Sequence, residues 1–318
     1  AQQRLGAYAL APGQRRFGFP TNELGFYDAP FASRSPARPT TIAMVGDSFS
    51  ASFVPHPYHY TTLAEQELGG SEVWNVGWPA LGPAEYAALL ERYVLPLDPD
   101  AVVVSLFLGN DLAETRPWNA LDRAIADWFD RGNVLLCEVP RRLWRIAGGR
   151  TATAGRDDRE PEPAWLHDPT LEPATFTDAA FLQLERERAV AAGTPDEPAL
   201  PAMLAWLRTL RSLAGPRPFG FVLIPDEFMV EDGLWQRIVA AGEPVPQRWL
   251  LRDTVVAFCQ EQGIPCLDLL PVLLAVPPLA DGNRHLYLRN DTHWNARGNA
   301  VAARALVPWL RNLLGRGR

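Results

Sequence analysis

Four short groups of polar residues along the chain combine the side chains that acyl transfer requires. They supply a hydroxyl at Ser48, a bare backbone at Gly77, an amide at Asn110, and a carboxylate and an imidazole at Asp291 and His293. A serine hydroxyl is a weak nucleophile at neutral pH and needs a neighbouring base to remove its proton. That base needs a carboxylate to orient its second ring nitrogen. The groups therefore predict a serine nucleophile, provided that the fold brings them together.

His293 is the best candidate for the base. Asp291 lies two residues before it, and in a loop this spacing can turn both side chains toward one place. The pair His56 and His59, in "PHPYHY", could be metal ligands. Because no third ligand group accompanies them, we expect them to pack beside the neighbouring tyrosines or to line the entrance of the site. The other two histidines are His167 and His285.

The negative oxygen that develops during acyl transfer must meet hydrogen-bond donors that are fixed in advance. The expected donors of this oxyanion hole are the backbone N–H groups of Ser48 and Gly77 and the side-chain amide of Asn110. Glycine suits a place where the backbone must approach a substrate closely. Taken singly, each residue also has a structural explanation: Ser48 could cap a helix, and the other two could serve turns.

Apolar runs of strand length alternate with helical patterns and explain how these residues could meet. The runs cover 41–45, 73–76, 101–108, 219–224 and 264–267, and the helical patterns cover 60–68, 83–95, 201–213, 247–262 and 295–314. This alternation predicts an α/β fold with a parallel sheet covered on both faces. Ligands of such sheets bind beyond the carboxyl ends of the strands. Each polar group follows a strand or precedes the last helix, so we expect one shared site.

Other carboxylates follow the same runs. Asp47 and Asp111 are expected to cap or brace turns, and neither receives a chemical role. Asp226 and Glu227 follow the fourth run and lie at the predicted sheet edge. Contact with substrate and capping of a helix both remain open for them.

Two segments depart from the alternating pattern. Residues 1–40 are rich in Arg, Pro, Gly and aromatic residues, and we interpret them as an irregular N-terminal arm on the domain that covers 41–318. The segment at about 112–200 is too long for a simple crossover and is interpreted as an insertion. It could form a cap over the site or only elaborate the surface, and both alternatives stay open.

Bulk composition restricts the partners. The 318 residues are 47% hydrophobic and 21% charged, as in a soluble globular protein. A net charge of −7 argues against a nucleic-acid partner. No run of apolar residues is long enough for a transmembrane helix. The chain begins with Ala, so an extracytoplasmic location is expected, whether secreted, periplasmic or anchored by a removed N-terminal segment. The oligomeric state stays open.

The cysteines and the glycine patterns indicate no cofactor. Cys137, Cys259 and Cys266 form neither a CxxC pair nor a zinc-binding spacing, and their odd number argues against a full disulfide framework. One pairing, between Cys259 and Cys266, stays open. The chain has no GxGxxG pattern and no P-loop. We therefore expect neither a metal nor an organic cofactor.

The polar groups resemble a known family when they are taken together. GDS at 46–48, the turn at Gly77, GND at 109–111 and DTH at 291–293 look like the four blocks of the SGNH, or GDSL, hydrolases, in the same order. One block alone is a weak signal, whereas four in order, each after a strand-like run, are specific. The resemblance spans residues 41–299 apart from the insertion.

The resemblance implies a flavodoxin-like three-layer α/β/α fold with a parallel sheet of about five strands. It also implies Ser48 as the nucleophile, His293 as the base and Asp291 as the partner of the base. Ser48, Gly77 and Asn110 would form the oxyanion hole.

Two departures bear on the acceptor of the acyl group. The common hydrolase block places Asp three residues before His, whereas "DTHWN" looks more like the block of the alginate-type O-acetyltransferases. In those transferases the Asp-His pair precedes the serine, but here it follows, as in ordinary esterases. The sequence therefore predicts a serine esterase acting on carboxylic esters, with O-acetyl groups of carbohydrates as one candidate. An O-acetyltransferase with a sugar hydroxyl as acceptor is the alternative, and a catalytically silent binding protein of this fold is the second.

Overall fold

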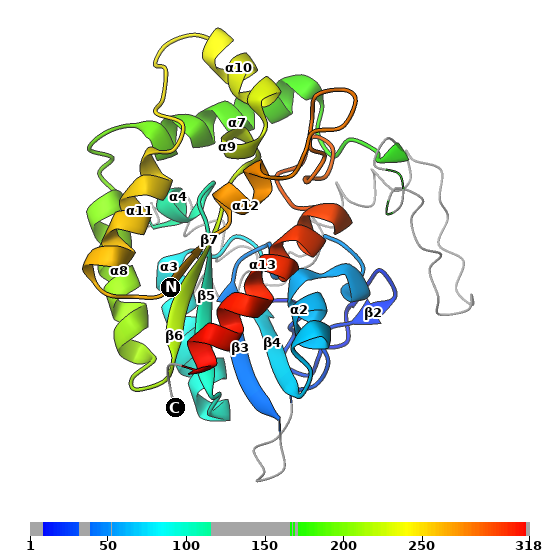
Figure 1. Cartoon of the computed structure of the whole chain (residues 1–318), viewed down its shortest axis with the longest axis vertical. Helices are drawn as coiled ribbons and strands as arrows, with labels where there is room; N and C mark the ends of the chain where they lie inside the picture. Colours follow the sequence, from blue (N-terminus) through cyan, green and yellow to red (C-terminus); the bar gives the residue numbers. More distant parts are fainter. Residues whose placement is uncertain are drawn as a thin grey trace, which may run out of the picture.

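A five-stranded parallel sheet forms the centre of the molecule (Figure 1). The computed structural model describes residues 9–31, 39–51, 53–115, 166, 168 and 171–315. In spatial order the strands are β4 (Ser71–Gly77), β3 (Thr40–Gly46), β5 (Ala101–Phe107), β6 (Phe219–Ile224) and β7 (Cys266–Asp268). All neighbouring pairs are parallel. The second strand along the chain lies outside the first, which is the flavodoxin-like order, and the predicted fold class is confirmed.

Helices cover both faces of the sheet. On one face α13 (Ala296–Gly315) packs against α2 (Tyr60–Leu68), and on the other α3 (Pro83–Leu89) packs against α8 (Leu200–Leu213) (Figure 1). Helix α11 (Leu250–Glu261) connects β6 to β7 together with the short helices α9 (Glu227–Val230) and α10 (Asp232–Ala240). Because both faces are covered, every residue of β5 is buried, as its continuous apolar run predicts.

Prolines explain two places where a helix or strand boundary differs from the one predicted from the sequence. The helix expected over 83–95 continues beyond Leu89 only as a π-helical turn (Leu90–Val94) and a 3-10 turn (Leu95–Leu97). Pro96 lies in this last turn, where it lacks an N–H for the helical ladder. Likewise Pro265 has no N–H to pair, and β7 begins one residue later, at Cys266.

Part of the expected insertion contains a long helix. Residues 116–165 of it lie outside the described residues, but α7 (Asp178–Gly193) packs against α10 and α11. Its apolar pattern is interrupted by Glu185, which is fully buried and accepts from Arg188 at 3.3 Å. A buried carboxylate within the inward face hides the helical period from the sequence. The remaining short helices are α4 (Asp111–Glu114), α12 (Leu270–Leu274) and the 3-10 turn η1 (His56–Tyr58).

The N-terminal arm is part of the packed structure over its described residues, 9–31. It contains a small hairpin of β1 (Arg15–Arg16) and β2 (Phe19–Pro20). Phe26 is fully buried and stacks on Trp78 with 4.9 Å between ring centroids. Asp28 accepts the backbone N–H of Asn75 in β4 at 2.7 Å. The arm therefore covers the edge of the sheet at β4.

Two further expectations are decided by the described residues. Cys259 and Cys266 are free thiols, so the disulfide left open by the sequence is not formed, and Cys137 lies outside the described residues. Within the same residues, no helix combines the length and the apolar character that a membrane span requires.

Candidate active site

Ser48, His293 and Asp291 form a continuous chain of hydrogen bonds. Ser48 Oγ lies 2.8 Å from His293 Nε2, and His293 Nδ1 lies 2.6 Å from Asp291 Oδ1. The backbone N–H of His293 donates to the same carboxylate oxygen at 3.1 Å. The fold thus brings together residues that are far apart in the sequence, in the geometry that a general base and its orienting carboxylate require.

Two strands end in glycine so that the turn carrying Ser48 can fold back on them. Gly46 and Gly77 are register partners at the ends of β3 and β4. A Cβ on Gly46 would lie 2.7 Å from Ser50 Oγ, and one on Gly77 would lie 2.4 Å from Ser50 Cβ. Any side chain at either position would push the turn away. The two glycines therefore set the place of Ser48 at the sheet edge.

His59 stabilises the same turn through hydrogen bonds at both of its ring nitrogens. Its Nε2 donates to the backbone oxygen of Phe49 at 2.9 Å, and its Nδ1 accepts from the Thr61 hydroxyl at 2.6 Å. A carbonyl can only accept, so Nε2 must carry a proton. Burial lowers the pKa of His59 to about 4, which keeps it neutral near pH 7. The ring packs beside Tyr60, as expected from the sequence.

Asp47 braces the turn from inside the protein. Its carboxylate is fully buried and accepts the backbone N–H of Phe49 at 3.1 Å. Burial raises the pKa of Asp47, and hydrogen bonds from Phe49 and from the backbone N–H of Ser48 offset only part of this rise. The Ser48 N–H, one of the three expected oxyanion donors, is therefore shared with this carboxylate.

Gly77 is the last residue of β4 and Asn110 follows β5, and these two strands flank β3. Asn110 lies immediately before α4, and its Oδ1 is buried without a hydrogen-bond partner among the described residues. By contrast, each carboxyl oxygen of Asp111 accepts a hydrogen bond, one from the Tyr86 hydroxyl at 2.7 Å and one from the backbone N–H of Phe107 at 3.0 Å. The GND turn is therefore held by its aspartate, which leaves the asparagine amide unengaged.

The loop that carries Asp291 and His293 is a short hairpin before α13. Tyr287 and Trp294 form an antiparallel bridge, and the backbone N–H of Leu288 donates to the oxygen of His293 at 2.8 Å. At its tip Asn290 has a φ of 47°, in the left-handed region that Asn tolerates better than most residues. The hairpin explains how two side chains two residues apart can act at one place.

Residues 175–178, which lie within the expected insertion just before α7, run beside this hairpin. The backbone N–H of Thr175 donates to the oxygen of Arg289 at 3.1 Å, and that of Phe176 donates to the oxygen of Asn290 at 3.3 Å. The Asn290 amide in turn donates to Asp178 Oδ1 at 2.7 Å. Residues 175–178 therefore support the hairpin that carries His293, the predicted base.

Asp291 remains ionised in this environment. Burial alone would raise its pKa, but the hydrogen bonds from the ring and backbone of His293, the charge of that ring and a hydrogen bond from the Thr175 side chain outweigh it and lower the pKa. An ionised carboxylate accepts a hydrogen bond from His293 Nδ1–H, which leaves Nε2 free to accept one from the Ser48 hydroxyl. On its other side, the His293 ring stacks on Phe53 with 3.5 Å between centroids.

Sequence reasoning identified the three side chains of the hydrogen-bonded chain but missed several of their supports. Thr175 and Asn290 carry no local motif, because their partners lie more than a hundred residues away. His59 was noticed, but as a possible metal ligand or packing residue. Across the described parts of the chain, no three His, Cys, Asp or Glu side chains gather as metal ligands. His56 instead stacks on Phe19, with 3.7 Å between centroids.

A family comparison agrees with this geometry. Residues 240–317, which contain the Asp-His hairpin and α13, match the family described as "SGNH hydrolase-like domain, acetyltransferase AlgX". The resemblance to the SGNH hydrolases is confirmed at the level of the superfamily. No curated protein matches the chain. The matched residues include Asp291 and His293, whereas Ser48, Gly77 and Asn110 lie outside them.

Several solved structures are similar to this SGNH-like chain. A lipase/acylhydrolase from Enterococcus faecalis is 15% identical over 87% of this chain and 96% of its own, with a TM-score of 0.44. A carbohydrate acetylesterase family member from Sinorhizobium meliloti is 11% identical over 87% and 99%, with a TM-score of 0.42. An acetylxylan esterase from Geobacillus stearothermophilus is 14% identical over 86% and 94%, with a TM-score of 0.44. Likenesses this distant do not carry the substrate of one protein to another.

Proposed function

We propose that the protein is a serine ester hydrolase that works through a covalent acyl intermediate. The observation that carries this proposal is the contact of Ser48 Oγ with His293 Nε2 at 2.8 Å, together with the contact of His293 Nδ1 with Asp291 at 2.6 Å. The first contact gives the hydroxyl a base, and the second fixes the tautomer that leaves this base unprotonated.

The reaction follows from these contacts in two halves. Ser48 Oγ attacks the ester carbonyl while Nε2 takes its proton, and the tetrahedral intermediate collapses when His293 returns this proton to the departing alcohol. Water then attacks the acyl-serine with Nε2 again as the base, and the carboxylic acid leaves as Ser48 regains its proton. Asp291 stabilises the imidazolium that exists in each half.

The oxyanion of each intermediate would meet the backbone N–H of Gly77, the amide of Asn110 and the shared N–H of Ser48. The neighbouring Asp111 holds the turn that carries Asn110 in place, because it accepts the backbone N–H of Phe107 at 3.0 Å. A turn held in this way can keep the Asn110 amide N–H fixed toward the developing charge, as oxyanion stabilisation requires.

The proposal is tested by labelling and turnover. A fluorophosphonate probe should label the native protein at Ser48, and p-nitrophenyl acetate should be hydrolysed. Ser48→Ala should abolish labelling and lower kcat at least about 10⁴-fold. Ser212→Ala, on the exposed end of α8, is the matched control and should change neither. Folded protein that takes no label would instead support the catalytically silent binding protein.

An O-acetyltransferase is the second candidate, because the matching family description names an acetyltransferase and its match includes Asp291 and His293. Both reactions share the acyl-serine and differ in what resolves it. Acetate and acetylated sugar are therefore quantified after acetyl-donor turnover with and without added oligosaccharide. A hydrolase releases one acetate per donor in either case, whereas a transferase diverts the acetyl group to the sugar.

A further inference from the structure

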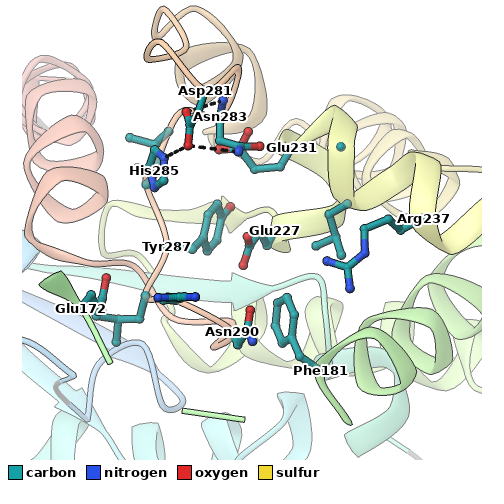
Figure 2. Close-up of a pocket in the computed structure, with 15 residues that line it drawn as sticks. Glu172, Phe181, Glu227, Glu231, Arg237, Asp281, Asn283, His285, Tyr287 and Asn290 are labelled. Carbon is teal, nitrogen blue, oxygen red and sulfur yellow. Dashed lines mark hydrogen bonds and ion pairs between the residues drawn. The ribbon is translucent and has the colours of Figure 1, made fainter. Parts of the chain in front are cut away.

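A cavity of about 580 Å³ lies directly beside the Asp-His hairpin (Figure 2). Its walls come from α7, α9, α10 and residues 281–290. Helix α9 follows β6 immediately, so the cavity lies at the same carboxyl edge of the sheet as Ser48. Residues 288–290 form part of its wall and precede Asp291 in the chain. One loop therefore separates the cavity from the predicted base.

Two of the acidic side chains in the wall contact basic groups. Asp281 Oδ2 contacts His285 Nε2 at 2.6 Å, and Figure 2 shows this pair at one end of the cavity. Glu231 accepts the backbone N–H of Arg284 at 2.9 Å and lies 3.6 Å from its guanidinium. These contacts account for Asp281 and Glu231.

Glu227 differs from the other carboxylates of the wall. Its Oε2 atom is buried and has no hydrogen-bond partner among the described residues. In Figure 2 its carboxyl group lies in the middle of the cavity, between Tyr287 and the Arg237 side. Burial, reinforced by Glu231 and Asp226, raises the pKa of Glu227 well above its usual range. A protonated, neutral carboxyl group can donate and accept hydrogen bonds, and Oε2 of Glu227 makes none with the described residues.

Apolar faces alternate with the polar groups. Phe181 and Tyr287 expose ring surface to the cavity, while Asn290 and, at the mouth, the exposed Arg237 supply further hydrogen-bonding groups (Figure 2). This mixture suits a ligand with hydroxyl groups around an apolar ring face. The volume falls within the range of about 300–1,000 Å³ that is usual for small-molecule sites.

We propose that this cavity binds an uncharged, polyhydroxylated part of the substrate, such as the sugar alcohol of an ester, with Glu227 as its innermost hydrogen-bonding group. This inference rests on the proposed esterase function and specifies the alcohol. Binding energy from hydroxyls remote from the reaction would hold the ester carbonyl at Ser48.

Glu227→Leu tests the assignment, because leucine is of similar size and has no polar atom. The probes are O-acetylated cellotriose, which can fill the cavity, and p-nitrophenyl acetate, which is too small to reach it. We expect kcat/KM for the trisaccharide ester to fall about tenfold or more, the effect of a lost buried hydrogen bond, with p-nitrophenyl acetate changed less than twofold. Glu187→Leu, at an exposed position of α7, is the matched control.

Each outcome bears on one proposal only. Equal losses for both probes, or none for either, would overturn the cavity assignment while hydrolysis of p-nitrophenyl acetate still upheld the esterase. Acetylcholine is tested as a cationic ester. If Glu227→Leu lowered kcat/KM for acetylcholine alone, Glu227 would bind a positive charge rather than hydroxyl groups, and the assignment would be overturned. If Glu227→Leu does not fold, Arg237→Ala at the exposed mouth gives the same comparison, with a smaller expected loss of about threefold.

Discussion

The imidazole of His293 has a different task at each ring nitrogen. Nδ1 is held by an ionised carboxylate at 2.6 Å, so its proton stays there, and Nε2 faces the Ser48 hydroxyl at 2.8 Å. Phe53 stacks on the ring and limits its rotation. Three independent contacts thus hold one tautomer and one orientation, both of which a serine nucleophile requires.

Replacing the Asp291 carboxylate by an amide should change the tautomer of His293 while leaving the orientation of its ring in place. In Asp291→Asn the new side chain can donate to Nδ1, which favours the opposite tautomer with the proton on Nε2. We expect kcat for p-nitrophenyl acetate to fall about 10⁴-fold, with only a small change in the melting temperature. Burst kinetics and thermal unfolding measure the two. A loss below tenfold would mean that Asp291 does not set the tautomer.

The element that supports the hairpin comes from outside the repeating α/β pattern. The segment 175–178 makes two backbone hydrogen bonds to residues 289–290, and Thr175 also donates from its side chain to the Asp291 carboxylate. These contacts place residues 175–178 of the expected insertion against the hairpin that carries Asp291 and His293. Thr175 is therefore a positioning residue that acts through Asp291.

Thr175→Val should weaken catalysis without removing any group that touches the substrate. The loss of one donor to an ionised carboxylate raises the pKa of Asp291, because that hydrogen bond favours the charged form. The acid limb of the kcat/KM profile should shift to higher pH, and kcat should fall about tenfold. Thr175→Ser keeps the hydroxyl and should restore both. A valine variant with the wild-type profile would leave Thr175 only a packing role.

At the scale of the whole molecule, periodicity and motif order were enough to predict the sheet, its helical layers and the meeting of Ser48 with His293. Those features depend on local patterns and on the rule that ligands lie beyond strand ends. Helix α7 escaped detection because Glu185 is buried within its inward face. The unpartnered state of Glu227 escaped as well, because it depends on α10 and on the hairpin rather than on neighbours in sequence.

The free energy of unfolding should depend on pH, because buried carboxyl groups and the buried His59 change it in opposite directions. Burial raises the pKa of Asp47 and Asp111, so both favour the folded state at low pH and lose this contribution as the pH rises through their folded pKa values. His59 acts in the other direction. Its pKa is lowered to about 4, so from about pH 6.5 downward the unfolded chain takes a proton that the folded one refuses.

Comparing the native protein with His59→Gln isolates the contribution of His59 to the pH dependence of the free energy of unfolding, because both proteins contain the same carboxyl groups. Glutamine can donate to the Phe49 carbonyl and accept from Thr61 without titrating. The free energy of unfolding of the native protein, relative to the variant, should therefore decline by about 3 kcal/mol between pH 7 and pH 4, following the lowered pKa. Urea unfolding at several pH values measures this difference. A difference that stays constant across the range would mean that folding leaves the pKa of His59 unchanged, so that burial does not keep the ring neutral in the folded protein.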